Sequence, residues 1–140
     1  WMHNRVRMIV GSFLCKNLLI HWWEGEKWFF DKLVDADLGS NSSGWQWIAG
    51  CGADAAPYFR IFNPVTQSLK FDSNGDYIKK FLPELKNIPA EKIHTPWKIN
   101  KEDQKKFKCV IGKDYPMPIV DLSESRNVAL FTFSKLKIKT

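Results

Sequence analysis

Apolar residues recur at helical spacing through the first third of the chain. Residues 2–20 are expected to form one amphipathic helix, whose inward positions are Val6, Ile9, Val10, Phe13, Leu14 and Leu18. A second helix is expected over residues 24–34, with Phe29 and Leu33 among its inward positions. The Ser- and Asn-rich residues 39–44 are expected to form a polar turn, followed by a short helix over 45–49.

The second half of the chain contains more helix breakers. Residues 50–74 are expected to be rich in loops, and residues 76–82 to form a short helix that stops near Pro83. Later prolines should keep the chain extended or turning until a terminal helix over 123–136. No segment shows a convincing period of two. The expected fold class is therefore all-α, with long Pro-rich loops.

Composition adds a preference for planar and anionic ligands. Aromatic residues make up 14% of the 140 residues and include seven Trp, which indicates either planar ligands or a large packed core. The formal net charge of +6 favours a polyanionic partner, with nucleic acid as the first candidate and an acidic membrane surface as the alternative. No segment approaches the ~20 apolar residues that a membrane-spanning helix needs. The chain is expected not to cross a membrane.

Cysteine and histidine spacing gives no sign of a metal site. The three cysteines are odd in number and widely separated, so neither a disulfide framework nor a zinc site is expected, and a reducing compartment fits best. The three histidines share no ligand spacing. We expect no bound metal.

The first eight residues place unusual side chains on one helical stripe. Trp1, Asn4, Arg5 and Met8 stand at positions i, i+3, i+4 and i+7. A core stripe would not carry Asn and Arg, and a solvated stripe would not usually carry Trp and Met. This face is therefore expected to meet a ligand that has flat apolar and anionic parts.

A second group of candidate residues follows the second helix. Asp35 and Asp37 could reach one polar ligand from an extended turn, or could cap the next helix. A carboxylate close to Arg7 would form a charge-assisted pair. Trp45 and Trp47 are about 200° apart if their segment is helical, so they must serve different faces.

Four ordered motifs together resemble the flavin-binding helical domain of the DNA photolyase and cryptochrome family. They are Trp-Met-His-Asn-Arg at 1–5, Asp-Ala-Asp-Leu at 35–38, Gly-Trp-Gln-Trp at 44–47 and the run from Ala55 to Pro64. The resemblance extends from Trp1 to about Arg126. It implies that residues 1–140 are the C-terminal part of an FAD-binding domain. An antenna domain, with a pigment of unknown identity, and the first half of the flavin pocket would then lie outside this chain.

The resemblance also implies roles for individual residues. The expected FAD-binding residues are Arg7, Asp35, Ala36, Asp37 and Asn41, where Asn41 would face the flavin although it could equally be a helix cap. The expected electron carriers are Trp45 and Trp22. The expected contacts to substrate DNA are Asn4, Arg5, Met8, Trp47 and Gln67, with Trp47 stacking on a flipped-out dimer or simply packing inside the protein.

By the same resemblance, the expected function is light-driven repair of cyclobutane pyrimidine dimers in DNA by electron transfer from reduced FAD. Met8 is typical of members that act on these dimers, most like the class I enzymes, whereas His stands at this position in the branch that acts on the other main pyrimidine photoproduct. The alternative is a cryptochrome-type blue-light receptor without repair activity, and a third hypothesis is a helical nucleic-acid-binding module without cofactor. The longer protein is expected to be a monomer in the bacterial cytoplasm, near the nucleoid, or in a eukaryotic nucleus or organelle.

Overall fold

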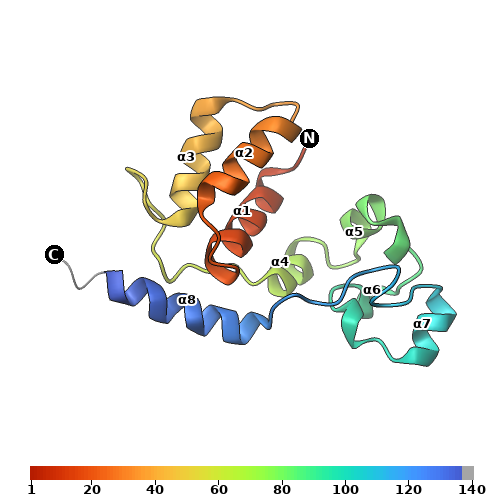
Figure 1. The fold of residues 1–140 in the computed structure, drawn as a ribbon. Helices are drawn as coiled ribbons and strands as arrows, with labels where there is room; N and C mark the ends of the chain where they lie inside the picture. The colour runs from red at the N-terminus through yellow and green to blue at the C-terminus, as the bar shows by residue number, and fades with distance from the viewer. Residues whose placement is uncertain (137–140) are drawn as a thin grey trace. The chain divides into compact units, whose positions relative to one another are not determined.

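The computed structural model describes residues 1–136, which form two compact helical units (Figure 1). Unit 1 contains residues 1–63 and the segment from Val120 onward, and unit 2 contains Pro64–Ile119. Within the described residues there is no β-strand, and strand-like pairing is limited to an isolated bridge between Ile111 and Tyr115. The all-α fold class is thus confirmed. In the same part of the chain, no helix combines the length and apolar character needed to cross a membrane.

Unit 1 is built from four α-helices and one π-helix. These are α1 (Asn4–Ser12), the π-helix (Phe13–Asn17), α2 (Trp22–Lys32), α3 (Leu38–Ala49) and α8 (Leu122–Leu136). Helix α3 packs against both α1 and α2, while α8 lies along the π-helix (Figure 1). The buried core of the unit consists of Cys15, Phe29, Trp45, Ile48 and Phe62.

The single helix expected over residues 2–20 is shorter and less regular in the structure. It begins at Asn4 because the His3 imidazole accepts a hydrogen bond from the Arg5 backbone N–H and caps the helix. Its last turn widens into the π-helix, and the chain then leaves the helix through Leu19, whose φ is 53°. A left-handed backbone at a bulky residue ends the helical path, and this feature has no periodic signal in the sequence.

The prediction of a polar turn over residues 39–44 is wrong, because these residues belong to the first half of α3. Asp37 caps the helix by accepting a hydrogen bond from the Ser40 backbone N–H at 2.8 Å. The Asn41 amide donates to the Glu26 backbone carbonyl at 2.7 Å, and the Ser42 hydroxyl donates to the Glu26 carboxylate at 2.9 Å. These polar side chains therefore bind α2 instead of competing for their own backbone, which removes the usual reason for a turn.

Unit 2 contains four short helices joined by two 3-10 turns. The helices are α4 (Pro64–Phe71), α5 (Asp76–Phe81), α6 (Ala90–Ile93) and α7 (Lys101–Phe107), and the turns are Pro83–Leu85 and Pro96–Lys98. The expected helix over 76–82 is confirmed by α5, whereas α4, α6 and α7 lie in segments expected to be loop or extended chain. Pro64 opens α4, where a missing N–H costs nothing, and Asn100 caps α7 by accepting from the Asp103 backbone N–H at 2.8 Å.

The terminal helix expected over residues 123–136 is confirmed as α8 with a one-residue difference at its start. The Asp121 carboxylate accepts hydrogen bonds from the backbone N–H groups of Ser123 and Glu124 and so fixes this start. Ser125 and Ala129, one helical turn apart, are the buried residues of α8. These small residues let α8 approach the π-helix closely, and the Asn17 amide donates to the Ser125 hydroxyl at 2.8 Å.

Candidate cofactor pocket

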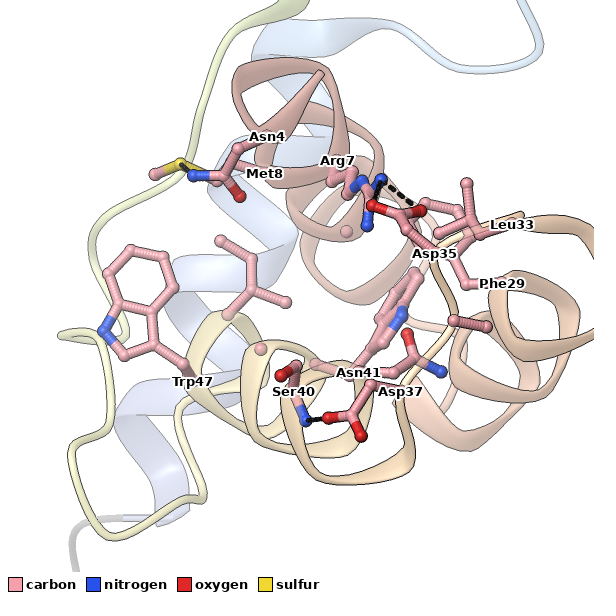
Figure 2. Close-up of a pocket in the computed structure, with 15 residues that line it drawn as sticks. Asn4, Arg7, Met8, Phe29, Leu33, Asp35, Asp37, Ser40, Asn41 and Trp47 are labelled. Carbon is pink, nitrogen blue, oxygen red and sulfur yellow. Dashed lines mark hydrogen bonds and ion pairs between the residues drawn. The ribbon is translucent and has the colours of Figure 1, made fainter. Parts of the chain in front are cut away.

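Unit 1 encloses a pocket of about 450 Å³ between α1, α2, α3 and the loop that joins α2 to α3 (Figure 2). Its apolar wall contains aromatic and aliphatic side chains from α2, from the residue that follows it and from α3: Phe29, Leu33, Trp45 and Ile48. Its polar side chains come mainly from α1 and the start of α3: Asn4, Arg7, Asp35, Asp37, Ser40 and Asn41. A planar ligand with one polar edge suits such a division of the lining.

Arg7 and Asp35 form an ion pair at one end of the pocket, opposite Trp47 (Figure 2). The Arg7 Nη2 lies 2.8 and 2.7 Å from the two Asp35 carboxylate oxygens, and the Arg7 Nε donates to the Met2 carbonyl at 2.6 Å. The hydrogen bond from Arg7, aided by its charge, lowers the pKa of Asp35. The charge-assisted pair expected for Arg7 is confirmed, while its contact with a flavin stays a prediction.

Asp37, Asn41 and Ala36 all line the pocket, as the resemblance implied. Asp37 is the cap of α3, and the hydrogen bonds from Ser40 hold its pKa below the ordinary value. Asn41 lies within α3, so it is not the cap of that helix. Its amide nitrogen donates to the Glu26 carbonyl of α2. That bond fixes the orientation of the amide beside the pocket. Binding of FAD by these three residues stays a prediction.

Trp45 and Trp22 both belong to the packed interior of unit 1. Trp45 is 4% exposed and meets the Phe29 ring edge-on at 5.0 Å between centroids. A Cβ placed on Gly25 would lie 2.1 Å from the Trp45 ring, so the glycine is what lets α2 accommodate this indole. Trp22 is half-buried against the same core cluster. Electron transfer through the two indoles stays a prediction.

Trp47 lies at the other end of the pocket from the ion pair (Figure 2). Its ring is half-buried, and the Arg60 guanidinium lies 5.4 Å from the ring centroid. Arg60 is equally close to the Phe62 ring. A cation that close to an indole face stabilises it, so Arg60 supports the pocket wall at Trp47. Arg60 belongs to the fourth motif, but no local pattern in the sequence predicts this role for it.

Only two of the four residues in the stripe proposed for residues 1–8 lie at the pocket. Asn4 and Met8 line the pocket, and the Asn4 amide donates weakly to the Met8 sulfur at 3.8 Å. Trp1 is 72% exposed, precedes the helix, and is absent from the lining together with Arg5. The pocket face of α1 instead runs through Asn4, Arg7, Met8 and Gly11. The same i, i+3, i+4, i+7 rule counted from Asn4 would have found it.

Gln67 is not part of this pocket, because it stands on α4 in unit 2. Its side-chain carbonyl oxygen is buried and has no hydrogen-bond partner in the structure. A DNA contact for Gln67 therefore stays a prediction. Within residues 1–136, no group of His, Cys, Asp or Glu side chains is arranged to hold a metal ion.

Comparison with known proteins gives consistent results over nearly the whole chain. Residues 1–135 match the sequence family described as the FAD binding domain of DNA photolyase. The chain is 57% identical to a deoxyribodipyrimidine photo-lyase of Alkalihalophilus pseudofirmus, over 95% of this chain and 28% of that protein. It is 55% identical to the deoxyribodipyrimidine photo-lyase of Agrobacterium fabrum, over 99% of this chain and 29% of that protein. The chain thus spans less than a third of the length of these relatives.

Two solved structures have the same arrangement of helices. A class III photolyase from Agrobacterium tumefaciens superposes with a TM-score of 0.93 at 54% identity, over 99% of this chain and 29% of that one. A cryptochrome from Synechocystis superposes with a TM-score of 0.88 at 44% identity, over 94% of this chain and 27% of that one.

Proposed function

This chain belongs to the family of the FAD-binding domain of DNA photolyase, and on that premise we propose that it is the C-terminal part of that domain in a longer photolyase. The longer enzyme uses light and reduced FAD to repair cyclobutane pyrimidine dimers in DNA. The observation that carries this proposal is the pocket of unit 1, which joins the Arg7–Asp35 ion pair, Asn41 and the two tryptophans of α3. The relatives named as deoxyribodipyrimidine photo-lyases support the reaction.

The residues of the pocket fit FAD, the cofactor in the family's description. The apolar wall around Phe29 and Ile48 suits a ring system, and the ion pair and amide suit its polar edge. Gly44 also lines the pocket, and a Cβ added there would meet no heavy atom within 4 Å, so the backbone leaves open space beside the cavity. When bound and excited, reduced FAD supplies one electron to the dimer and recovers it after the ring splits.

The side chains of this chain bind and position the reactants in the proposed enzyme. Arg7, held by Asp35, gives a fixed cation beside the cofactor, and the oriented Asn41 amide gives a hydrogen-bonding group. Asp35, Ala36 and Asp37 form the adjoining wall. Trp45 and Trp22 carry electrons to the cofactor when it must be reduced by light. None of these residues needs to act as a nucleophile.

On the substrate side, Trp47 provides the stacking surface for a dimer taken out of the duplex. Stacking on an aromatic side chain is worth roughly 1 to 3 kcal/mol per base, which partly replaces the stacking lost from the helix. Asn4 and Met8 contact the dimer from α1, and Arg5 and Gln67 contact the DNA backbone. The substrate remains the cyclobutane dimer on the evidence of Met8. The proposal no longer assigns the chain to class I, because a class III photolyase is as similar to this chain as the relatives quoted above.

A second candidate function is that of a blue-light receptor with the same pocket and no repair. The likeness to the Synechocystis cryptochrome is the observation that favours it. We rank it second because the quoted relatives are photo-lyases. In either case we propose a monomer in the bacterial cytoplasm.

The experiment replaces the matching segment of the Agrobacterium fabrum photo-lyase with this chain. The purified chimera should show the absorption of bound FAD and should split dimers in light. Arg5→Ala should weaken binding to damaged and to undamaged DNA equally. It should also reduce the salt dependence of binding, since a phosphate contact is lost. Trp47→Ala should remove the preference for dimer-containing DNA. A chimera that binds FAD but neither prefers nor repairs dimers would favour the receptor.

A further inference from the structure

Lys16 is the one Lys, Arg, Asp or Glu side chain that is fully buried within residues 1–136. It stands on the π-helix, where Cys15 and Asn17 on either side are also buried. Burial of an ammonium group is unfavourable unless other groups compensate for its lost hydration. Burial accordingly lowers the pKa of Lys16, an effect that Cys15 and Cys51 partly oppose. The ion pairs found in the described residues do not include Lys16.

The groups that hold the ammonium belong to two different helices. Its Nζ donates a hydrogen bond to the Ala49 carbonyl at 3.1 Å and lies 3.8 Å from the centroid of the Phe133 ring. Ala49 is the last residue of α3, where carbonyls lack intrahelical donors and carry partial negative charge. The face of the Phe133 ring on α8 is also electron-rich. Lys16 therefore connects the C-terminal end of α3 with α8.

Two other carbonyls at this end of α3 already accept hydrogen bonds from backbone N–H groups. Gly50, with a φ of 85°, donates to the carbonyls of Gln46 and Trp47 at 3.0 and 3.2 Å. The Ala56 N–H also donates to the Trp47 carbonyl, at 3.0 Å. The Ala49 carbonyl instead accepts its hydrogen bond from the side chain of Lys16. The lysine thus adds to the cap of the helix whose last two turns carry both tryptophans of the pocket.

A methionine at this position would fill nearly the same space without a charge to bury. The hydrogen bond to Ala49 is what the lysine adds, and an apolar replacement would leave that carbonyl without its partner. Loss of the bond would release the end of α3, two residues from Trp47 and four from Trp45. Small displacements of stacking and electron-carrying rings affect function because both roles depend on geometry.

We propose that Lys16 is a positioning residue that fixes the C-terminal end of α3 and thereby the placement of Trp45 and Trp47 in the pocket. Its consequence for repair rests on the proposed function, in which Trp47 stacks on the dimer. The placement of the rings does not depend on that function. The two parts can therefore be tested separately.

The first test uses the A. fabrum chimera, labelled with ¹⁵N in its tryptophan indoles and assigned with Trp→Phe variants. Lys16→Met should shift the indole signals of Trp45 and Trp47 and leave that of Trp97, in unit 2, unchanged. The matched control is Lys32→Met, which removes an exposed lysine 5.3 Å from the Trp28 ring. This control should shift the Trp28 signal alone. A folded Lys16→Met protein with unchanged Trp45 and Trp47 signals would overturn the proposal.

A second variant decides the case if Lys16→Met does not fold. Phe133→Leu keeps Lys16 but removes the ring that holds its ammonium beside the Ala49 carbonyl, so the hydrogen bond to that carbonyl should weaken. It should shift the same two indole signals by a smaller amount, and unchanged signals would again reject the proposal.

The second test measures the preference for dimer-containing over undamaged DNA. It should fall about tenfold in Lys16→Met, with FAD still bound, because a displaced Trp47 loses part of the stacking that favours the dimer. A full preference in that variant would overturn the functional part of the proposal. If the unsubstituted chimera itself shows no preference, the proposed function has failed, and the indole signals alone decide the role of Lys16.

Discussion

The same substitution at two helical glycines should change stability in opposite directions. Gly25 is the fourth residue of α2, and Gly44 lies in the middle of α3. Replacing a helical Gly by Ala usually stabilises a protein by roughly 0.5 to 1 kcal/mol, because Ala loses less conformational entropy on folding. The surroundings of the new methyl group then decide the sign of the net effect. These surroundings differ completely between the two positions.

At Gly25, a Cβ would lie 2.1, 2.5 and 2.6 Å from three atoms of the Trp45 ring. Trp45 is 4% exposed and rests on Phe29, so the indole cannot withdraw without displacing the core. Overpacking of this kind costs typically 1 to 3 kcal/mol, and the depth of this clash places it at about the upper end. After the helix gain is subtracted, Gly25→Ala should destabilise unit 1 by about 2 kcal/mol.

At Gly44, a Cβ meets no heavy atom within 4 Å, so the helix gain of roughly 0.5 to 1 kcal/mol should appear undiminished. The two variants should therefore differ by about 3 kcal/mol. Urea unfolding of the A. fabrum chimera, followed by circular dichroism, measures both values. Since Gly44 lines the pocket, its variant should also bind FAD more weakly although it is more stable. A Gly25→Ala protein as stable as Gly44→Ala would refute the packing of Trp45 described above.

The remaining predictions concern electron transfer, the ion pair and acid stability. Trp45→Phe should slow photoreduction of oxidised FAD and leave repair by chemically reduced enzyme intact; unchanged photoreduction would exclude Trp45 as a carrier. Asp35→Ala should lower the FAD content per protein because Arg7 loses its partner, whereas Asp103→Ala, which breaks the ion pair of unit 2, should not. The pKa of Asp37 is lowered in the folded state, so its contribution to stability is complete above about pH 4 and is lost as the pH falls through the folded pKa. Asp37→Asn should remove this part of the acid transition in circular dichroism, and an unchanged acid limb would contradict the capping role.

The sequence predicted the chemistry of the pocket better than it predicted the helices that form it. Arg7 and Asp35 are 28 residues apart, and their pairing could be expected because the motifs around them resemble a known family. The helical conformation of residues 39–44 could not be predicted from the conformational preferences of these residues. Its Ser, Asn and Gly residues favour turns in isolation, and only the presence of Glu26 on α2 gives Asn41 and Ser42 partners outside their own backbone.

Lys16 shows a second limit of periodicity. Along the sequence it interrupts an apolar segment and would be placed on a solvated face. The π-helix changes the angle between successive residues, so a residue that regular α-helical spacing would direct outward faces the core. The partners that make this burial tolerable, Ala49 and Phe133, lie 33 and 117 residues further along the chain. No local pattern contains that information.

Helix α3 is held by three side-chain contacts, and two of them come from residues that also line the pocket. Asp37 caps its first turn, Asn41 binds it to α2, and Lys16 holds its last carbonyl. Only the last of these three contacts comes from a residue outside the pocket lining. A ligand that displaced Asp37 or Asn41 would loosen the helix that carries Trp45 and Trp47, whereas Lys16 can hold it whatever the pocket contains. This independence suits the lysine, rather than the residues of the pocket wall, to keep the two indoles in place when a ligand enters the pocket.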